Sequence, residues 1–170
     1  MPLPSAGTVP ARRGPPKDVR PLDNTDRAIL RALVDDARVS NKDLAEKAGV
    51  AQSTCLARVR ALREAGVVRG YHADVDPKAL GHDLQAMIAI RLQPHARGAM
   101  AQFTAELSRR PEVLEVYFVA GANDFLVHVA TASTDALRRF VGDLLNRDPA
   151  IAGTETNLIF EHTRAAGLRH

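Results

Sequence analysis

The stretch SNKDLAEKAGVAQSTCLARVRALREAG, residues 40–66, contains two short helical patterns separated by one glycine. Ser40 is placed to cap the first helix, with Asp43 at its third position, and Gly49 ends it, because glycine adopts a left-handed backbone at little cost. The second pattern starts within about three residues and runs to Ala65. Two helices this close must cross sharply, which predicts a helix-turn-helix.

The second helix of this pair is expected to enter DNA. Leu56, Val59 and Leu62 are predicted to face the core, which leaves the first turn polar. Short polar side chains there can approach base edges, arginines can reach phosphates or guanines, and the helix dipole adds positive potential. The alternative is an ordinary solvated helix face. The predicted DNA-binding residues are Lys42, Gln52, Ser53, Thr54, Arg58 and Arg63.

Composition changes along the chain and divides it into segments. Residues 1–21 hold six of the ten prolines together with several basic residues, and they lack the apolar content needed to offset the entropy of ordering. A helix is expected from Asn24 to about Asp36, and the β-prone segment 67–75 is expected to fold back as a wing. The predicted segments are a disordered basic tail over 1–21, a winged helix-turn-helix over 22–75, a hinge over 76–83, a second domain over 84–162 and a tail over 163–170.

The second half of the chain changes to a period of two. In LQAMIAIRL, residues 84–92, apolar side chains alternate strictly, which predicts a strand with Leu84, Ala86, Ile88, Ile90 and Leu92 on one face. Further strands are expected over 113–120, 125–131 and 154–161, with helices after the first and third strands. The order βαββαβ predicts an α+β fold of ferredoxin-like type, with an antiparallel sheet covered by both helices on one face.

The opposite face of this sheet is expected to be too apolar to remain in water. A homodimer that pairs two such faces would cover it, and its two-fold symmetry would place two helix-turn-helix units side by side on a pseudo-palindromic operator. The residues predicted for this face are Met87, Ala89, Val113, Tyr117, Val119, Leu126 and Ile159.

Other features exclude several classes of protein. No apolar run is long enough to span a bilayer, the N-terminus lacks the apolar core of a secretory signal, and one cysteine cannot form an internal disulfide. A cytoplasmic protein is expected, with Cys55 as a buried structural thiol. The six histidines form no zinc-binding pattern, so neither a metal site nor a catalytic site is predicted, and His128 is interpreted as a hydrogen-bonded sheet residue.

Three stretches together carry a family resemblance. LDNTDRAILRALVDDARVSNKDLAEKAGV (22–50), STCLARVRALREAGVVRGYHADVDPKALG (53–81) and GANDF (121–125) resemble the Lrp/AsnC family, also called feast/famine regulators. The resemblance implies a regulator of amino-acid metabolism genes, with a winged helix-turn-helix and an ACT-like sensing domain, assembling as dimers and often octamers. The excess of arginine over lysine and the basic tail are similar to actinobacterial members, including regulators of alanine dehydrogenase.

The GAND turn is the candidate site for a small amino acid. Its glycine lets backbone N–H groups converge on a carboxylate, and the Asp carboxylate can pair with an ammonium group, although the same residues also make a good hairpin turn. The resemblance implies that effectors bind at this turn between neighbouring dimers, near polar residues of the last strand. The expected effector-binding residues are Gly121, Ala122, Asn123, Asp124, Thr154 and Thr156.

Enzymes form the rival class. Ferredoxin-like dimers also serve as small monooxygenases or haem-modifying enzymes, and sirohaem decarboxylases resemble this whole family, helix-turn-helix included. No cofactor and no catalysis are expected here, because the sequence contains no phosphate-binding glycine loop, metal-ligand pattern or nucleophile with an obvious base.

Overall fold

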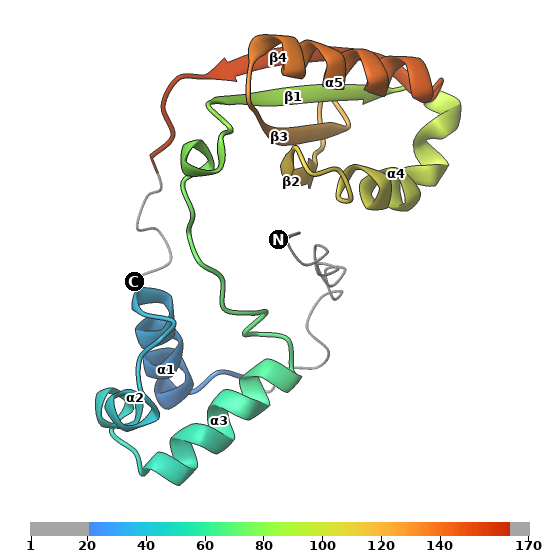
Figure 1. Cartoon of the computed structure of the whole chain (residues 1–170). Coiled ribbons are helices and arrows are strands. Elements are labelled where there is room, and N and C mark those ends of the chain that lie inside the picture. Colours follow the sequence, from blue (N-terminus) through green and yellow to red (C-terminus); the bar gives the residue numbers. More distant parts are fainter. Residues whose placement is uncertain (1–20, 164–170) are drawn as a thin grey trace, which may run out of the picture. The chain divides into compact units, whose positions relative to one another are not determined.

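The computed structural model describes residues 21–163, so all but one residue of each predicted tail lies outside the described range. The chain divides into two compact units, the first ending at Ala73 and the second comprising Asp74–Thr163 (Figure 1). The first unit is helical and the second contains the sheet. Among the described residues, no helix is long and apolar enough to cross a membrane.

Three helices form the first unit: α1 Asn24–Asp35, α2 Asn41–Ala48 and α3 Gln52–Glu64. The second begins at the predicted cap, since Ser40 Oγ accepts a hydrogen bond from the backbone N–H of Asp43 across 3.1 Å. Gly49 ends it with a φ of 65°, a left-handed conformation that favours glycine. The helix-turn-helix predicted from the sequence is therefore present.

A reciprocal capping box opens α1. The backbone N–H of Asp26 donates to the Asp23 carboxylate across 2.8 Å, and the backbone N–H of Asp23 donates to the Asp26 carboxylate across 3.3 Å. These bonds satisfy two of the backbone groups that a helix end leaves without partners. The carboxylates of Asp23 and Asp26 are thereby fixed side by side at the start of the domain.

The core of the first unit shows that α3 is rotated from its predicted orientation. Its buried residues are Ile29, Ala32, Leu44, Ala45, Cys55 and Leu62. Cys55 is fully buried, as expected, whereas Leu56 is 61% exposed, so the prediction that Leu56 faces the core is wrong. Val59 and Leu62 do face the core as predicted, so the buried face is shifted toward Cys55 by less than the 100° step of one residue. This rotation decides which arginines of α3 face outward.

The predicted wing is not formed by strands. Residues 69–76 carry no regular secondary structure, and the next element is the short helix η1, Pro77–Leu80. The Asp76 side chain accepts a hydrogen bond from the backbone N–H of Lys78 across 3.0 Å, which fixes the start of this turn. The β-branched residues that suggested a wing, Val67 and Val68, instead pack against the helical core.

The second unit has the predicted order of elements. Its strands are β1 Leu84–Leu92, β2 Val113–Phe118, β3 Phe125–Thr131 and β4 Ile151–Ile159, and its helices are η2 Pro94–Ala99, α4 Met100–Leu107 and α5 Thr134–Arg147. The strands lie in the order β2-β3-β1-β4, and every neighbouring pair is antiparallel. This is the ferredoxin-like arrangement.

Both longer helices of this unit pack on the same face of the sheet. Phe103 and Leu107 of α4 and Leu144 of α5 share one buried cluster with Ile88 and Ile90 of β1. The inward face predicted for β1 is confirmed, because its alternate residues enter this cluster.

The opposite face of the sheet carries most of the residues predicted for it. Met87 lies opposite His128, Ala89 opposite Leu126, and Tyr117 opposite Leu126, so these side chains share one face. The assignment of Val113 to this face was wrong, because Val113 pairs with Val129 and packs against the buried core. A register shift after Val113 turns the rest of β2, which explains the error.

Candidate DNA-binding and effector sites

The first turn of α3 presents polar groups at the surface. Gln52, Ser53 and Thr54 are all exposed, as predicted, and the N-cap residue Ala51 supplies no side-chain hydrogen bond. The Asn41 side chain donates to the backbone carbonyl of Gln52 across 3.1 Å, which ties the start of α2 to the start of α3. This end of the helix therefore combines exposed side chains with backbone N–H groups that can donate hydrogen bonds to a phosphate.

Two of the predicted basic residues are also exposed. Lys42 lies in the first turn of α2, and Arg63 lies in the last turn of α3. The guanidinium carbon of Arg63 is 5.8 Å from the centroid of the Tyr71 ring, a cation–π distance. Lys42 and Arg63 are thus available at the surface, although Arg63 already has an aromatic partner within its own unit.

Arg58 differs from the prediction. Its Nη1 atom lies 2.5 Å from the carboxylate of Asp23 and 3.0 Å from that of Asp26, and its side chain is only 28% exposed. Hydrogen bonds to Asp23 and then Asp26 raise the pKa of Arg58 above its ordinary value. A guanidinium held in this way points toward α1, so the structure gives Arg58 an internal partner where the sequence suggested DNA.

Arg60, which is not among the residues predicted to bind DNA, lies on the exposed face of α3. Its side chain is 81% exposed, and its Nε donates to Glu64 across 2.8 Å, an i,i+4 pair on the outer face of α3. At 100° per residue, Arg60 lies on the same side of the helix as Ser53 and Ala57, opposite the buried Cys55. The rotation of α3 thus brings Arg60 to the outer face and takes Arg58 from it.

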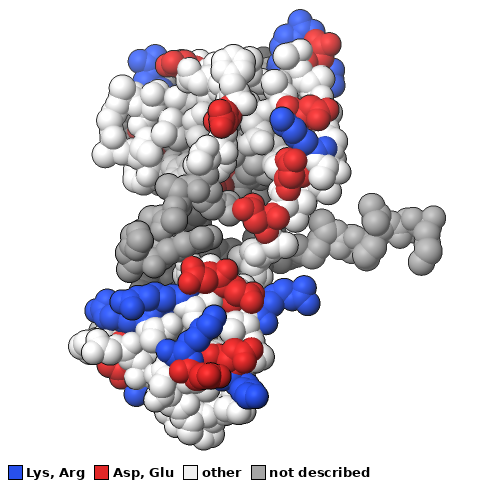
Figure 2. All heavy atoms as spheres, turned by 90° about the vertical axis from the view of Figure 1, so that its left-hand side faces the viewer, with Lys and Arg blue, Asp and Glu red and all other residues white. Residues whose placement is uncertain are grey.

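The charge on the first unit is mixed. In Figure 2 this unit is the lower body, and on the face shown Lys and Arg side chains form several groups with Asp and Glu side chains between them. The whole chain carries a formal net charge of only +3. A surface of this kind favours DNA binding through particular helix contacts over a broad basic patch.

The predicted effector turn joins β2 to β3. Gly121 has a φ of 143°, in the region that favours glycine, and Gly121 and Ala122 are exposed while Asn123 is half-buried. These three residues are accessible to a small molecule. The conformation agrees with either a hairpin turn or part of an anion-binding loop.

Asp124 has a structural role beside any role in binding. Its side chain is buried, and a carboxylate oxygen accepts a hydrogen bond from the backbone N–H of Leu92 across 2.8 Å. Its backbone N–H donates to the carbonyl of Ile90 across 2.9 Å. The pairing of β1 with β4 shifts register between Arg91 and Leu92, so the carboxylate satisfies a backbone donor at that irregularity.

Thr154 and Thr156 lie on the far side of β1 from the turn. They pair with Ile90 and Ile88 of β1, and Ile90 pairs in turn with Phe125 at the start of β3. Two strand spacings, about 10 Å, therefore separate the row of Thr154 from the turn. Within one chain these residues do not close a pocket.

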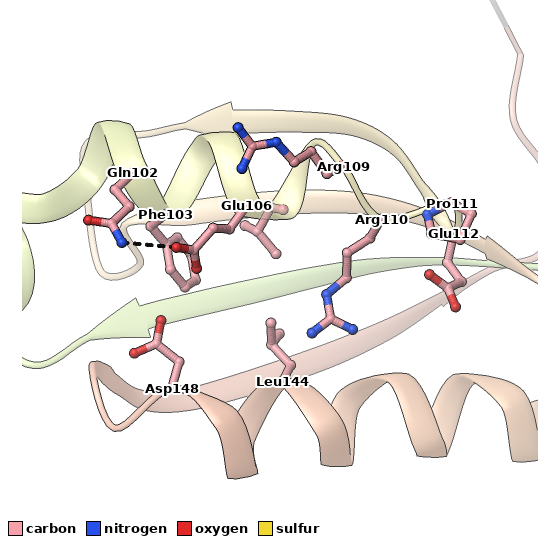
Figure 3. Close-up of a pocket in the computed structure, with 10 residues that line it drawn as sticks. Gln102, Phe103, Glu106, Arg109, Arg110, Pro111, Glu112, Leu144 and Asp148 are labelled. Atoms are coloured by element: carbon pink, nitrogen blue, oxygen red, sulfur yellow. Dashed lines mark hydrogen bonds between the residues drawn. The ribbon is translucent and has the colours of Figure 1, made fainter. Parts of the chain in front are cut away.

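A cleft of about 700 Å³ lies elsewhere, between α4 and α5 (Figure 3). Phe103, Leu107 and Leu144 line it and also belong to the buried core. Arg110 points into the space between the helices, with its guanidinium carbon 5.4 Å from the ring centroid of Phe140. None of the residues predicted for the effector lines this cleft.

The remaining titratable candidates are accounted for by local contacts. A ring nitrogen of His128 lies 2.9 Å from the side-chain oxygen of Gln85, which agrees with its interpretation as a hydrogen-bonded sheet residue. Burial lowers the pKa of His128, and burial raises the pKa of the Cys55 thiol. Among the described residues, no group of three or more His, Cys, Asp or Glu side chains could hold a metal ion.

Two family models match the chain, one for each unit. A winged helix-turn-helix DNA-binding domain matches residues 22–69, and the Lrp/AsnC ligand-binding domain matches residues 85–166. Figure 1 shows the corresponding helical and sheet-containing parts.

Related proteins match over nearly the whole length. The HTH-type transcriptional regulator AldR of Mycolicibacterium smegmatis is 55% identical over 155 residues, covering 90% of this chain and 91% of that protein. The protein of the same name from Mycobacterium tuberculosis is 52% identical, covering 88% and 85%. These names support a regulator over the enzymes considered as rivals.

Solved structures agree with these matches. The crystal structure of MtbAldR has a TM-score of 0.74 at 47% identity, covering 85% of this chain and 99% of that chain. A transcriptional regulator from Neisseria meningitidis, crystallised as a complex with L-methionine, has a TM-score of 0.76 at 30% identity, covering 85% and 94%. With its DNA-binding and ligand-binding domains in this order, the chain belongs to the Lrp/AsnC family of transcriptional regulators.

Proposed function

We propose that the protein binds a pseudo-palindromic promoter operator as a homodimer and that a small amino acid changes this binding. The observation that carries the proposal is the exposed first turn of α3, the second helix of a helix-turn-helix in a member of a regulator family. Members of this class place that helix in the major groove with its N-terminal residues on base edges.

The proposed DNA contacts divide into two kinds. Gln52, Ser53 and Thr54 would contact base edges, because their short polar side chains stand at the exposed start of α3. Lys42, Arg60 and Arg63 would contact phosphates, because they are exposed cations on the two helices of the helix-turn-helix, α2 and α3. Arg58 is left out of this set, since its guanidinium is held by Asp23 and Asp26.

The open face of the sheet is the proposed dimer interface. Met87, Leu126 and Ile159 are half-buried, and Tyr117 is 41% exposed, so residues 21–163 leave this apolar face partly open. A second copy would bury on the order of 800 Å² per subunit, which is typical of stable interfaces. Dimers could assemble further into octamers, as the family resemblance implies.

The effector is proposed to bind at the turn of Gly121, Ala122 and Asn123, with Thr154 and Thr156 contributed from strand β4. Because one chain leaves these groups about two strand spacings apart, a neighbouring subunit would complete the site. Asp124 would act mainly by holding the turn in place. The effector would then favour one assembly over another and change the spacing of the recognition helices.

The resemblance to the AldR proteins makes a gene of alanine metabolism, such as that for alanine dehydrogenase, the specific regulatory target that we propose. The site of action would be the cytoplasm, where the promoter DNA lies. No cofactor other than the amino acid is required for this role.

Calorimetric titration with each of the twenty amino acids tests the sensing role. We expect heat of binding from at least one small amino acid, reduced in Asn123→Ala and Thr156→Ala and unchanged in Thr134→Ala, a matched change at an exposed threonine of α5. Light scattering on the same samples would report any change of assembly. An absence of binding across the whole panel would contradict the sensing role and leave DNA binding to be judged on its own.

A further inference from the structure

One arginine of α3 is held against the protein by two carboxylates and is only partly exposed to solvent. Arg58 bridges Asp23 and Asp26, which precede it by 35 and 32 residues. Both carboxylates belong to the capping box that opens α1, so their positions are fixed by the backbone of that helix. The bridge thus connects the start of α1 to the middle of α3.

The side chains of Arg58, Asp23 and Asp26 are buried to different extents. The Asp26 side chain is fully buried, while those of Arg58 and Asp23 are 28% and 42% exposed. A buried carboxylate needs a partner of opposite charge and hydrogen-bond donors, and Arg58 supplies both at 3.0 Å. Swinging Arg58 outward to a phosphate would remove that partner.

Two kinds of contact hold α3 in its rotation, an apolar stripe and the Arg58 bridge. Cys55 and Leu62 are its two buried residues, and Val59 is partly buried against the same core, so α3 presents a stripe of three apolar residues. Apolar packing is non-directional, whereas an arginine hydrogen-bonded to two fixed carboxylates has a defined direction. The Arg58 bridge therefore adds a directional restraint to the rotation that turns Ser53 and Arg60 outward.

We propose that Arg58 is a positioning residue for DNA recognition: it locks α3 against the Asp23–Asp26 pair and so sets the face that meets the groove. This inference rests on the proposed role of α3 in DNA binding. Arg58 itself makes no phosphate or base contact, and its effect on DNA binding passes through the orientation of the recognition helix.

The salt dependence of DNA binding separates a positioning residue from a contact residue. Removing one phosphate contact reduces the slope of log affinity against log salt by about one, whereas removing an internal bond lowers affinity and leaves the slope unchanged. The variants Arg58→Ala, Arg58→Lys, Asp23→Asn and Arg60→Ala, with Arg138→Ala as a control, would be titrated against the protein's own upstream promoter fragment. Arg138 matches Arg60 because it is an exposed arginine paired with an acidic residue of its own helix.

We expect Arg58→Ala to lower the melting temperature and to weaken DNA binding by about tenfold or more, the scale of one good base contact, at an unchanged salt slope. Asp23→Asn should weaken binding in the same way although it removes a negative charge, and Arg58→Lys should recover part of the loss. Combining Asp23→Asn with Arg58→Ala should weaken binding by less than the product of the two single effects, because the changes break one bridge.

The opposite pattern would overturn the inference. If Arg58→Ala reduced the salt slope as Arg60→Ala does, or if Asp23→Asn strengthened binding by removing a negative charge, Arg58 would be a DNA contact. Should Arg58→Ala fail to fold, Arg58→Lys and Asp23→Asn give the same comparison, since each keeps one half of the bridge. A wild-type protein that did not bind its promoter would instead contradict the proposed function, which keeps the two failures distinct.

Discussion

The backbone N–H of Leu92 donates to the buried carboxylate of Asp124, which lies 32 residues later in the chain, across 2.8 Å. The bond joins the predicted effector turn to the end of β1, where the pairing with β4 is irregular. The turn is consequently held by the sheet through the same residue that the sequence suggested for binding an ammonium group. This relationship bears on how variants of the turn are to be interpreted.

Replacing Asp124 is expected to affect folding before it affects sensing. Asp124→Ala leaves the Leu92 donor without its buried acceptor and should reduce the free energy of unfolding by about 1–3 kcal/mol in urea denaturation. Asp124→Asn keeps an acceptor oxygen and should cost less. Asn123→Ala, in the same turn, is the control and should leave stability nearly unchanged. Equal stability of Asp124→Ala and wild type would show that the bond contributes nothing.

Alanine substitutions at two leucines of α3 test which face of this helix is buried. Leu62 is 4% exposed and Leu56 is 61% exposed. We expect Leu62→Ala to destabilise the protein by about 2–5 kcal/mol and Leu56→Ala by about 0.5 kcal/mol or less, measured by urea denaturation. The reverse order would restore the orientation that the sequence predicted and would return Arg58 to the outer face.

His128 gives a pH dependence of defined sign. Burial lowers its pKa in the folded state, the nearby Glu115 raises it, and His162 lowers it. Below the ordinary histidine pKa of about 6.5 the unfolded chain therefore binds more protons at this position, so the free energy of unfolding falls as pH decreases from there. His128→Gln should make this fall shallower, whereas His95→Gln, a change at an exposed histidine, should alter it less. Denaturation at fixed protein concentration measures both, and equal slopes for wild type and His128→Gln would contradict the expectation.

Cys55 is expected to behave as a structural thiol. It is fully buried in the first unit, and burial raises its pKa, which reduces the thiolate fraction. A chromogenic disulfide reagent should therefore react slowly with the native protein and quickly in denaturant. Cys55→Ser should destabilise by about 1–3 kcal/mol because it buries a hydroxyl in an apolar cluster. Rapid reaction of the native protein would contradict this placement.

Much of the fold was accessible from the sequence because its signals are local. The cap at Ser40, the glycine at position 49 and the alternation in β1 each report backbone conformation directly. The order of strands and helices followed from these signals, and the structure confirms it. The family resemblance rests on the same stretches.

The exact rotation of α3 was not accessible, because the sequence places both Cys55 and Leu56 on the apolar side of the helix. Only Cys55 is buried, and this smaller shift decides that Arg58 faces α1 while Arg60 faces outward. The bridge of Arg58 to Asp23 and Asp26 spans more than 30 residues, a separation over which helical periodicity carries no information.

The effector turn was likewise predictable from the sequence only in part. Its glycine and polar residues are a local signal, and the structure places a turn there. The bond from Leu92 to Asp124 depends on the pairing of strands far apart in sequence and on a register irregularity that no local pattern encodes. The only signal in the sequence was the position of Asp124, a carboxylate that immediately precedes the strongly apolar strand β3.

Hydroxyl-radical footprinting on the protein's own upstream promoter fragment tests most directly whether the outer face of α3 carries DNA recognition. We expect the wild-type protein to protect paired segments about one helical turn, or a multiple of it, apart, as two recognition helices of a dimer require. The double variant Ser53→Ala/Arg60→Ala should lose this protection, and Arg138→Ala should retain it. An absence of protection at low ionic strength, or protection that survives in the double variant, would contradict the assignment of α3 as the recognition helix.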